Sequence, residues 1–172
     1  MSTSIVLTVV SDDHPGIVET LSQVVTDHGG NWAESSMMSL AGKFAGILLA
    51  EIPAEGVDAF LSSLDALEAK GLHIVAQSAE ADSASDAGRE YSLELVGQDH
   101  AGIVRDITEV LSGLAINVQE LETTVQSASM SGERLFMAHA KIQIPMEVSL
   151  DQLQDAMEQL AHELMVDITL ED

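Results

Sequence analysis

The chain repeats one six-residue phrase, and this repeat constrains the fold more than any other feature of the sequence. Residues 13–18 read DHPGIV and residues 99–104 read DHAGIV, so the two copies lie 86 positions apart. A chance match would be confined to the phrase. The same offset instead relates further positions on both sides of it: Ile5/Tyr91, Leu7/Leu93, Val9/Leu95, Ile17/Ile103, Val18/Val104, Leu21/Ile107, Val24/Val110, Val25/Leu111, Asn31/Asn117 and Glu34/Glu120.

The later part of each half also corresponds, once six inserted residues are allowed for. The matched pairs are Phe44/Phe136, Ile52/Ile144 and Pro53/Pro145. The segment SASMSGER at 127–134 is the place for the insertion, because insertions are tolerated in surface loops. The chain is therefore a tandem duplication. We predict domains at residues 1–78 and 91–172, joined by a linker at 79–90 that is rich in Ala, Ser, Asp and Gly.

Composition indicates a reducing compartment and excludes nucleic acid as a direct partner. The chain has no Cys, and 29 Asp and Glu against six Lys and Arg give a formal net charge of -23. Nucleic-acid binding draws on clustered cations, whereas the cations here are scattered along the chain. The N-terminus lacks the basic region of a signal peptide, and its apolar stretch IVLTVV is too short to span a bilayer. We therefore expect a cytoplasmic protein that does not bind membranes.

Hydrophobic periodicity predicts the element order βαββαβ in each half. In the first half we predict a strand at 3–10, a helix ending at Gly29 and Gly30, strands at about 31–39 and 44–52, a helix from about Val57 that stops at Gly71, and a strand at 72–77. In the second half we predict strands near 91–96, 117–126, 134–144 and 165–170, with helices near 102–112 and 149–162. This order is typical of an α+β, ferredoxin-like fold, in which a four-stranded antiparallel sheet carries two helices on one face.

The third strands of the two halves differ on the face that points away from the helices. The outward positions are Ala45, Ile47, Leu49 and Glu51 in the first half and Met137, His139, Lys141 and Gln143 in the second. An apolar sheet face is unfavourable in contact with water, and domains of about 80 residues bury only a modest share of their surface alone. We therefore expect at least the first sheet to be covered, either by its twin or by a second chain in a homodimer.

The repeated phrase has the features of an anion-binding corner. A strand that turns directly into a helix leaves free backbone amides at the helix start, where the dipole adds roughly half a unit of positive charge. Gly16 and Gly102 remove the side chain where a ligand would approach. The structural alternative is that Asp13 and His14 cap the helix, that Pro15 occupies its first turn and that the glycines permit close packing. Taken alone, the phrase favours this structural alternative.

The whole pattern resembles the ACT domain. The resemblance rests on the βαββαβ order, on (S/G)-x-D-H-x-G-I-V after the first strand and on an Asn at the start of the second strand. The pair of domains is similar to the tandem-ACT proteins related to the glycine cleavage system transcriptional repressor. ACT units in that family sense amino acids or other small molecules where two units meet. The resemblance implies ligand contacts from Asp13, His14, Gly16, Ile17 and Asn31, and from Asp99, His100, Gly102, Ile103 and Asn117.

The resemblance also implies a regulator that has no DNA-binding domain and that acts by contacting a DNA-binding activator. This agrees with the acidic composition. The longer loop at 127–134 implies that the two corners need not be equivalent and that both need not be occupied. A formyltetrahydrofolate deformylase begins with a similar unit, but we expect no counterpart of its catalytic domain.

Nothing else in the sequence predicts catalysis, a metal site or a cofactor. His162-Glu163 lacks a second His four residues on, where Val166 stands, so it is no zinc-protease motif. The sequence contains no G-x-S-x-G elbow and no G-x-x-x-x-G-K-[ST] loop. We therefore expect a non-enzymatic regulator that senses a small ligand. The alternatives are a ligand-independent module for protein interaction or dimerisation and, ranked last, an enzyme.

Overall fold

The computed structural model describes residues 1–79, 88–128, 130 and 132–172. Clustering of contacts divides the chain into two compact units, Met1–Ala81 and Asp82–Asp172. Most of the predicted linker at 79–90 lies outside the described residues. At its two ends, the amide of Ala79 donates to the carbonyl of Ser4, and Gly88 already belongs to the first strand of the second unit.

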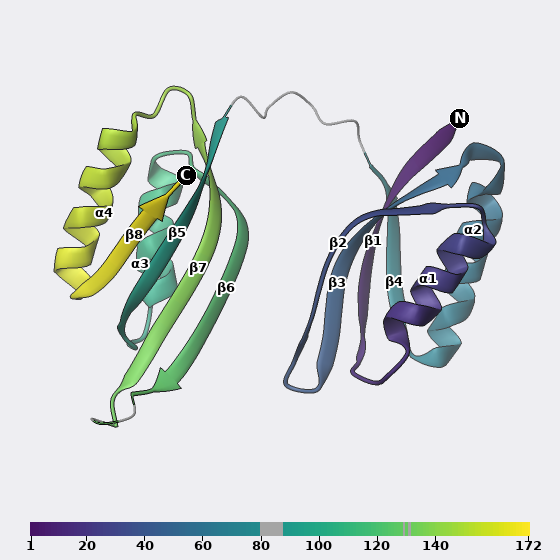
Figure 1. The fold of residues 1–172 in the computed structure, drawn as a ribbon, viewed down its shortest axis with the longest axis horizontal. Helices are drawn as coiled ribbons and strands as arrows, with labels where there is room; N and C mark the ends of the chain where they lie inside the picture. Colours follow the sequence, from purple (N-terminus) through teal and green to yellow (C-terminus); the bar gives the residue numbers. More distant parts are fainter. Residues whose placement is uncertain (80–87, 129, 131) are drawn as a thin grey trace. The chain divides into compact units, whose positions relative to one another are not determined.

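The first unit is a four-stranded antiparallel sheet with two helices on one face (Figure 1). The strand order β2-β3-β1-β4 places the first and third strands at the centre. The fold predicted for this half is confirmed. Its elements are β1 (Ser2–Asp12), α1 (Ile17–Asp27), β2 (Asn31–Leu40), β3 (Lys43–Pro53), the 3-10 turn η1 (Ala54–Gly56), α2 (Val57–Ala66), the 3-10 turn η2 (Leu67–Lys70) and β4 (His73–Ser78).

The second unit repeats this arrangement with the strand order β6-β7-β5-β8 (Figure 1). The predicted elements are confirmed, although β5 begins three residues earlier than the hydrophobic alternation indicates. Strand pairing alone extends β5, because Gly88 pairs with Pro145 at the far end of β7. The elements are β5 (Gly88–Gln98), α3 (Ile103–Gly113), β6 (Asn117–Ser127), β7 (Arg134–Pro145), α4 (Leu150–Leu164) and β8 (Val166–Glu171).

Each unit has its own hydrophobic core between the sheet and the helices. The positions related by the repeat occupy equivalent places in it: Leu7 and Leu93 on the central strands, Leu21 and Ile107 on the helices, and Phe44 and Phe136 on the hairpins. Full burial of a side chain of this size stabilises a domain by about 1.5–3 kcal/mol relative to exposure. The duplicated apolar pattern therefore specifies two separate cores of the same design.

The start of α1 differs from the predicted cap. The helix begins at Ile17, after Gly16, whose φ of 95° is left-handed. No side-chain cap is present among the described residues at this helix start, and Pro15 lies in the preceding turn. The prediction that Asp13 and His14 cap the helix with Pro15 in its first turn is therefore wrong. A left-handed glycine reverses the chain within one residue, which only glycine does without steric cost.

His28 at the end of α1 joins this helix to α2. Its Nδ1 donates to the carbonyl of Val24 over 2.7 Å, so that Nε2 accepts from the Ser63 hydroxyl at 3.2 Å. The ring also meets Phe60 edge-on, with 5.7 Å between centroids. The equivalent position in the second unit is Leu114. His28 is thus a structural residue of the first unit.

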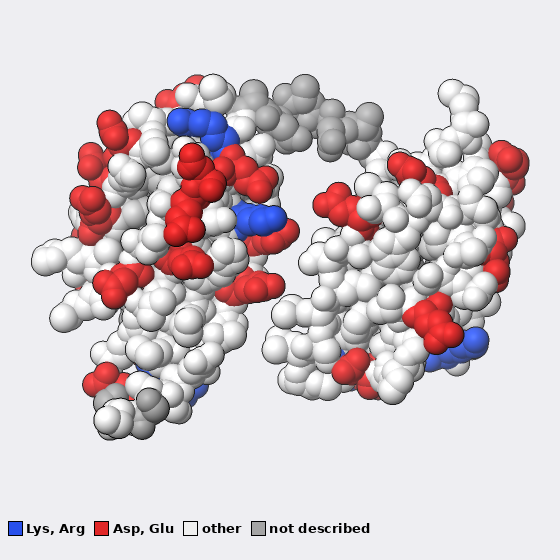
Figure 2. Space-filling view, viewed as in Figure 1, with Lys and Arg blue, Asp and Glu red and all other residues white. Residues whose placement is uncertain are grey.

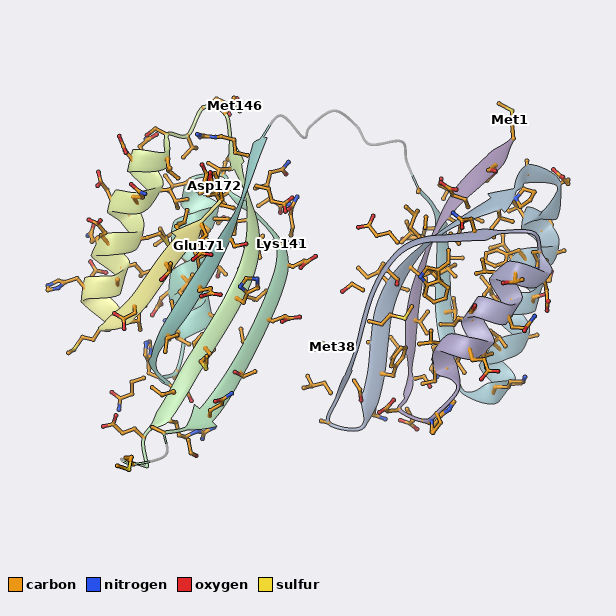
Figure 3. The ribbon with its side chains drawn as sticks, viewed as in Figure 1. Met1, Met38, Lys141, Met146, Glu171 and Asp172 are labelled. Carbon is orange, nitrogen blue, oxygen red and sulfur yellow. The ribbon has the colours of Figure 1, made fainter. Side chains whose placement is uncertain are left out.

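The helix-free side of each sheet is called here its open face. The first open face carries Val6, Thr8 and Val10 of β1, Ser36, Met38 and Leu40 of β2, Ala45, Ile47 and Leu49 of β3, and Val75 and Gln77 of β4. The second open face carries Ser92, Glu94 and Val96 of β5, Glu120, Glu122 and Thr124 of β6, Met137, His139 and Lys141 of β7, and Asp167, Thr169 and Glu171 of β8. Met38 and Lys141 both project from these faces (Figure 3). The predicted outward positions of β3 and β7 are confirmed, because Leu48 and Ala140 between them are buried.

Candidate functional site

The two phrases form equivalent corners where the first strand of each unit turns into its first helix. The first corner comprises residues 12–17 and the second corner residues 98–103. Gly102, like Gly16, is left-handed, with φ 84° and ψ 7°. The carbonyl of each glycine accepts the first intrahelical bond, from the amide of Thr20 at 2.9 Å and from that of Asp106 at 3.0 Å. The preceding amides of each helix are those that an external acceptor would engage.

The aspartate of each phrase anchors the corner to the neighbouring hairpin. The amide of Asp13 donates to the carbonyl of Gly42 over 2.9 Å, and its Oδ2 accepts from the Ser39 hydroxyl at 2.7 Å. The amide of Asp99 donates to the carbonyl of Arg134 over 2.9 Å, and its carboxylate lies 4.0 Å from Arg134 Nε. Both carboxylates are therefore engaged by the protein itself. These contacts hold each corner against its hairpin, and ligand binding by Asp13 and Asp99 stays a prediction.

The histidines of the two phrases differ in their surroundings. Nδ1 of His14 lies 3.0 Å from the carbonyl of Pro15, and Nδ1 of His100 lies 3.2 Å from that of Ala101, so each ring donates to the residue that follows it. His14 is exposed, whereas His100 is half-buried. Nε2 of His100 is shielded from solvent and has no hydrogen-bond partner within the described ranges. A buried polar atom of this kind gains from any partner that approaches it.

The remaining predicted residues are not gathered at the corners. Ile17 and Ile103 are 3% and 4% exposed and pack in the cores, so only their backbone amides face a ligand. Asn31 and Asn117 begin β2 and β6, where they pair with Glu51 and Gln143. The corners lie at the other end of each sheet, because Asp12 pairs with Lys43 and Gln98 with Leu135. Within one unit, the asparagine and the corner are therefore separated by the length of a helix.

Sequence reasoning missed the side chain that distinguishes the two corners. A Cβ built on Gly102 would lie 2.9 Å from Nη2 of Arg105, whereas one built on Gly16 would meet no described atom within 4 Å. Arg105 also reaches Asp106, with 3.2 Å between Nη2 and Oδ1. The equivalent of Arg105 in the first unit is Glu19. A comparison of positions 86 residues apart would reveal this difference in charge. The arginine makes the second corner more favourable to an anion than the first.

Lys43 and Asp12 add one charged contact beside the first corner. The Lys43 ammonium donates a hydrogen bond to the Asp12 carboxylate, and this bond, together with the charge of Lys43, holds the pKa of Asp12 below its usual value. Both side chains are largely exposed. The register-equivalent pair in the second unit is Gln98 and Leu135, which carries no charge.

Three hollows of the described surface lie away from residues 12–17 and 98–103. A groove of about 350 Å³ runs between α4 and β8, lined by residues that include Met157, Glu158 and Ile168. A hollow of about 240 Å³ lies on the second open face, beside Glu94, Glu122 and His139. Next to the first turn of α3, an apolar recess of about 20 Å³ has room for little more than one water molecule. At the first corner, the Cβ position of Gly16 faces open space, with no described atom within 4 Å.

In the described part of the chain, no three His, Asp or Glu side chains are grouped so that they would hold a metal ion. None of the described helices has the length and the apolar character that crossing a membrane requires.

Comparison with known proteins supports the resemblance seen in the phrases. The family model of the ACT domain matches residues 3–77. The crystal structure of an unknown protein from Galdieria sulphuraria is 30% identical and superposes with a TM-score of 0.84, covering 99% of this chain and 98% of that chain. No curated protein sequence matches significantly.

A second solved structure, of a candidate glycine cleavage system transcriptional repressor, is similar over 99% of this chain and 97% of that chain. It has a TM-score of 0.71 and 18% identity, a level that shows a shared fold alone. This likeness includes both units of the chain. The first unit is therefore an ACT domain, and the second unit repeats its fold in tandem.

Proposed function

We propose that this chain is a non-enzymatic regulatory protein that senses an amino acid or a similar small ligand through its tandem ACT units. In this proposal the protein modulates a protein partner, a transcriptional regulator, by direct contact in the manner of the glycine cleavage system repressor. It acts in the cytoplasm as a homodimer. Neither a cofactor nor a metal ion is part of the proposal.

The single observation that carries the proposal is the geometry shared by the two corners. Both units keep a left-handed glycine immediately before the first helix, at φ values of 95° and 84°. In both cases a helix start without a side-chain cap follows, as far as the described residues show. Helix α4 has a complete capping box instead, in which Gln152 N donates to Ser149 Oγ at 3.1 Å. Both corners therefore leave the first amides of their helix available to an external acceptor, whereas the side chains of α4 cap its own first amides.

The ligand needs a second wall, because the space beside Gly16 is open. In the family that the sequence resembles, this wall is a second ACT unit. The asparagines at the starts of β2 and β6 fit this role, since they are remote from the corner of their own unit and free to face the corner of another. A carboxylate of the ligand would accept from the amides of the helix start, and His100 Nε2 offers an unused polar atom at the second corner.

Regulation through a protein partner is supported by electrostatics. The net charge of -23 opposes direct contact with nucleic acid. Figure 2 shows acidic side chains over much of the visible surface of the second unit, with few cations among them. A protein of this kind influences transcription through another protein that itself binds DNA.

Titration calorimetry with glycine, serine, leucine and the other amino acids tests the sensing function. We expect saturable binding of at least one amino acid at millimolar or lower concentration. Gly16→Leu and Gly102→Leu place a side chain over the helix starts and should abolish that binding. Gly71→Leu is the matched control for Gly16→Leu, because Gly71 is also left-handed, with φ 85°, and a Cβ at either position meets no described atom within 4 Å. Each substitution costs about 1–2 kcal/mol of backbone strain, so circular dichroism checks that the variants fold.

The alternative function is a ligand-independent module for protein interaction or dimerisation. The apolar first open face favours it, because such a surface associates without any ligand. This alternative predicts that Gly16→Leu and Gly102→Leu leave partner binding intact. If no amino acid binds and both variants behave like the parent chain, the alternative replaces the sensing proposal.

A further inference from the structure

The first open face exposes a group of large apolar side chains at its centre. Met38, Ile47 and Val75 are 54%, 55% and 59% exposed, although they lie on three different strands. Val10 on β1 is exposed as well. Ile47 and Val75 lie in one cross-strand row on either side of Thr8, and Met38 lies in the neighbouring row, opposite Ala45. A contiguous apolar patch on a sheet is typical of an interaction surface.

The fold itself does not require this patch. The second unit has the same strand order and register, but the residues equivalent to Met38, Ile47 and Val75 are Thr124, His139 and Thr169. Polar contacts occupy that face, with 3.5 Å between His139 Nδ1 and Glu94 Oε1 and an ion pair of 3.8 Å between Lys141 Nζ and Glu120 Oε1. A polar open face is thus compatible with the architecture, so the apolar one serves a purpose outside its own unit.

Charge distribution identifies what covers the first open face. Its described centre carries no carboxylate: Glu34 and Glu51 lie toward one end, and Asp12 at the other end is bonded to Lys43. The rest of this acidic chain offers mainly surfaces bearing Asp and Glu. The second open face carries five carboxylates, on Glu94, Glu120, Glu122, Asp167 and Glu171. Burying such carboxylates against Ile47 and Val75 would cost their hydration without replacing it.

We propose that two copies of this chain associate through their first open faces, stacked sheet against sheet about a two-fold axis. Such an interface is self-complementary, because each copy contributes the same apolar patch. The helices cover the opposite side of the sheet, so this contact leaves the start of α1 accessible. This proposal rests on the homodimer of the proposed function and adds the surface through which the two copies meet. It does not depend on ligand binding.

The proposed contact has a distinctive response to salt. Two copies, each with a formal net charge of -23, repel one another at long range, while the contact itself is apolar and holds no ion pair between the copies. The screening length of this repulsion is about 8 Å at physiological ionic strength, and it becomes shorter at higher ionic strength. Dimerisation therefore strengthens as sodium chloride is added. Binding of a basic protein to the acidic surface would instead become weaker as sodium chloride is added.

Sedimentation equilibrium of the full chain tests the proposal. The test variant Met38→Thr/Ile47→His/Val75→Thr gives the first open face the residues that the second one carries in the same register, and it should therefore fold. We expect its dimer dissociation constant to rise about 100-fold. Met146→Ser is the control, because Met146 is 63% exposed in the loop after β7 (Figure 3) and should leave the constant unchanged. For the parent chain, the constant should fall between about 0.05 M and about 0.5 M sodium chloride.

A cross-linking measurement does not depend on the triple variant. Because the chain has no Cys, Thr8→Cys places a single thiol at the centre of the first open face, and Ala59→Cys places one on the exposed side of α2. A short bismaleimide should link two copies through position 8 and not through position 59. A parent chain that stays monomeric at high salt overturns both the dimer and its surface. A dimer that survives the triple variant, or that links through position 59 alone, overturns only the surface.

Discussion

The two units share one interior and differ on their exteriors. In the cores, the residues related by the repeat are conservative pairs, such as Leu7/Leu93 and Ile52/Ile144, and all four are buried. On the open faces the same register holds Ile47 in one unit and His139 in the other, or Leu49 in one and Lys141 in the other. Core positions are constrained by packing, whereas an open face is constrained only by what it meets. The difference indicates that the two sheets meet different surroundings.

The corners show the same contrast on a smaller scale. Their backbone is equivalent, with left-handed glycines and hairpin-anchored aspartates in both units. Their side chains differ, because Glu19 of α1 is replaced by Arg105 of α3. An acidic residue in the first helical turn favours the helix and disfavours an incoming anion, and Arg105 has the opposite effects. We therefore expect the second corner to bind a carboxylate ligand more tightly than the first.

The largest expected effects are in the shared interior. Leu7→Ala and Leu93→Ala each remove a buried side chain at an equivalent place, and each should destabilise its own unit by about 2–5 kcal/mol. Differential scanning calorimetry and urea unfolding measure this loss. Thr124→Ala on an exposed face is the control and should change stability by less than about 0.5 kcal/mol. If the losses of stability caused by Leu7→Ala and Leu93→Ala differ widely, the two cores are not equivalent.

The next effect concerns the open faces. His139→Ile/Lys141→Leu gives the second sheet the outward residues of the first, and we expect it to add a second self-association step, with affinity raised about tenfold or more. Light scattering at increasing sodium chloride measures this gain, which should grow with salt. The loss of the pairs with Glu94 and Glu120 works against the gain. A variant that aggregates less than the parent chain would break the proposed link between these positions and association.

A smaller effect is expected from exchanging the charges at the corners. Arg105→Glu should stabilise α3 by about 0.3–1 kcal/mol and weaken carboxylate binding at the second corner, and Glu19→Arg should do the reverse at the first corner. Thermal unfolding and calorimetry with the amino acid that binds best measure the two effects separately. If both variants bind that amino acid as the parent chain does, the contrast between the corners has no role in recognition.

The smallest effect is the pH dependence of the Asp12–Lys43 pair. Because Lys43 lowers the folded-state pKa of Asp12, the pair stabilises the first unit above the ordinary pKa of aspartate. This stabilisation is lost as the pH falls through the lowered value. The contribution is small, since both side chains are exposed. NMR titration should show the pKa of Asp12 rising toward its ordinary value in Lys43→Gln, and an unchanged titration would mean that the pair does not form in solution.

Much of this molecule follows from the sequence, because short-range physics governs it. Alternation of apolar residues at Ile5, Leu7 and Val9 predicts both the strand and the side that it buries. The outward positions of β3 follow from the same period of two. The duplication then transfers each assignment to the second unit. The uncapped start of α1 could not be predicted in the same way, since the sequence DHPG is compatible both with a left-handed glycine and with a polar cap.

Only the tertiary structure decided how the candidate site is assembled. The sequence places Asn31 close after the phrase, but α1 carries it to the opposite end of the sheet. The resemblance implies a ligand contact from Asp13, and only the fold shows that the hairpin also brings Ser39 to its side chain and Gly42 to its amide. The sequence shows Arg105 and Glu19 in register without showing that Arg105 reaches over Gly102. Periodicity along the chain determines which residues are buried together. Contacts between segments that are distant in the sequence depend instead on how the helices and strands pack and on where their ends then lie.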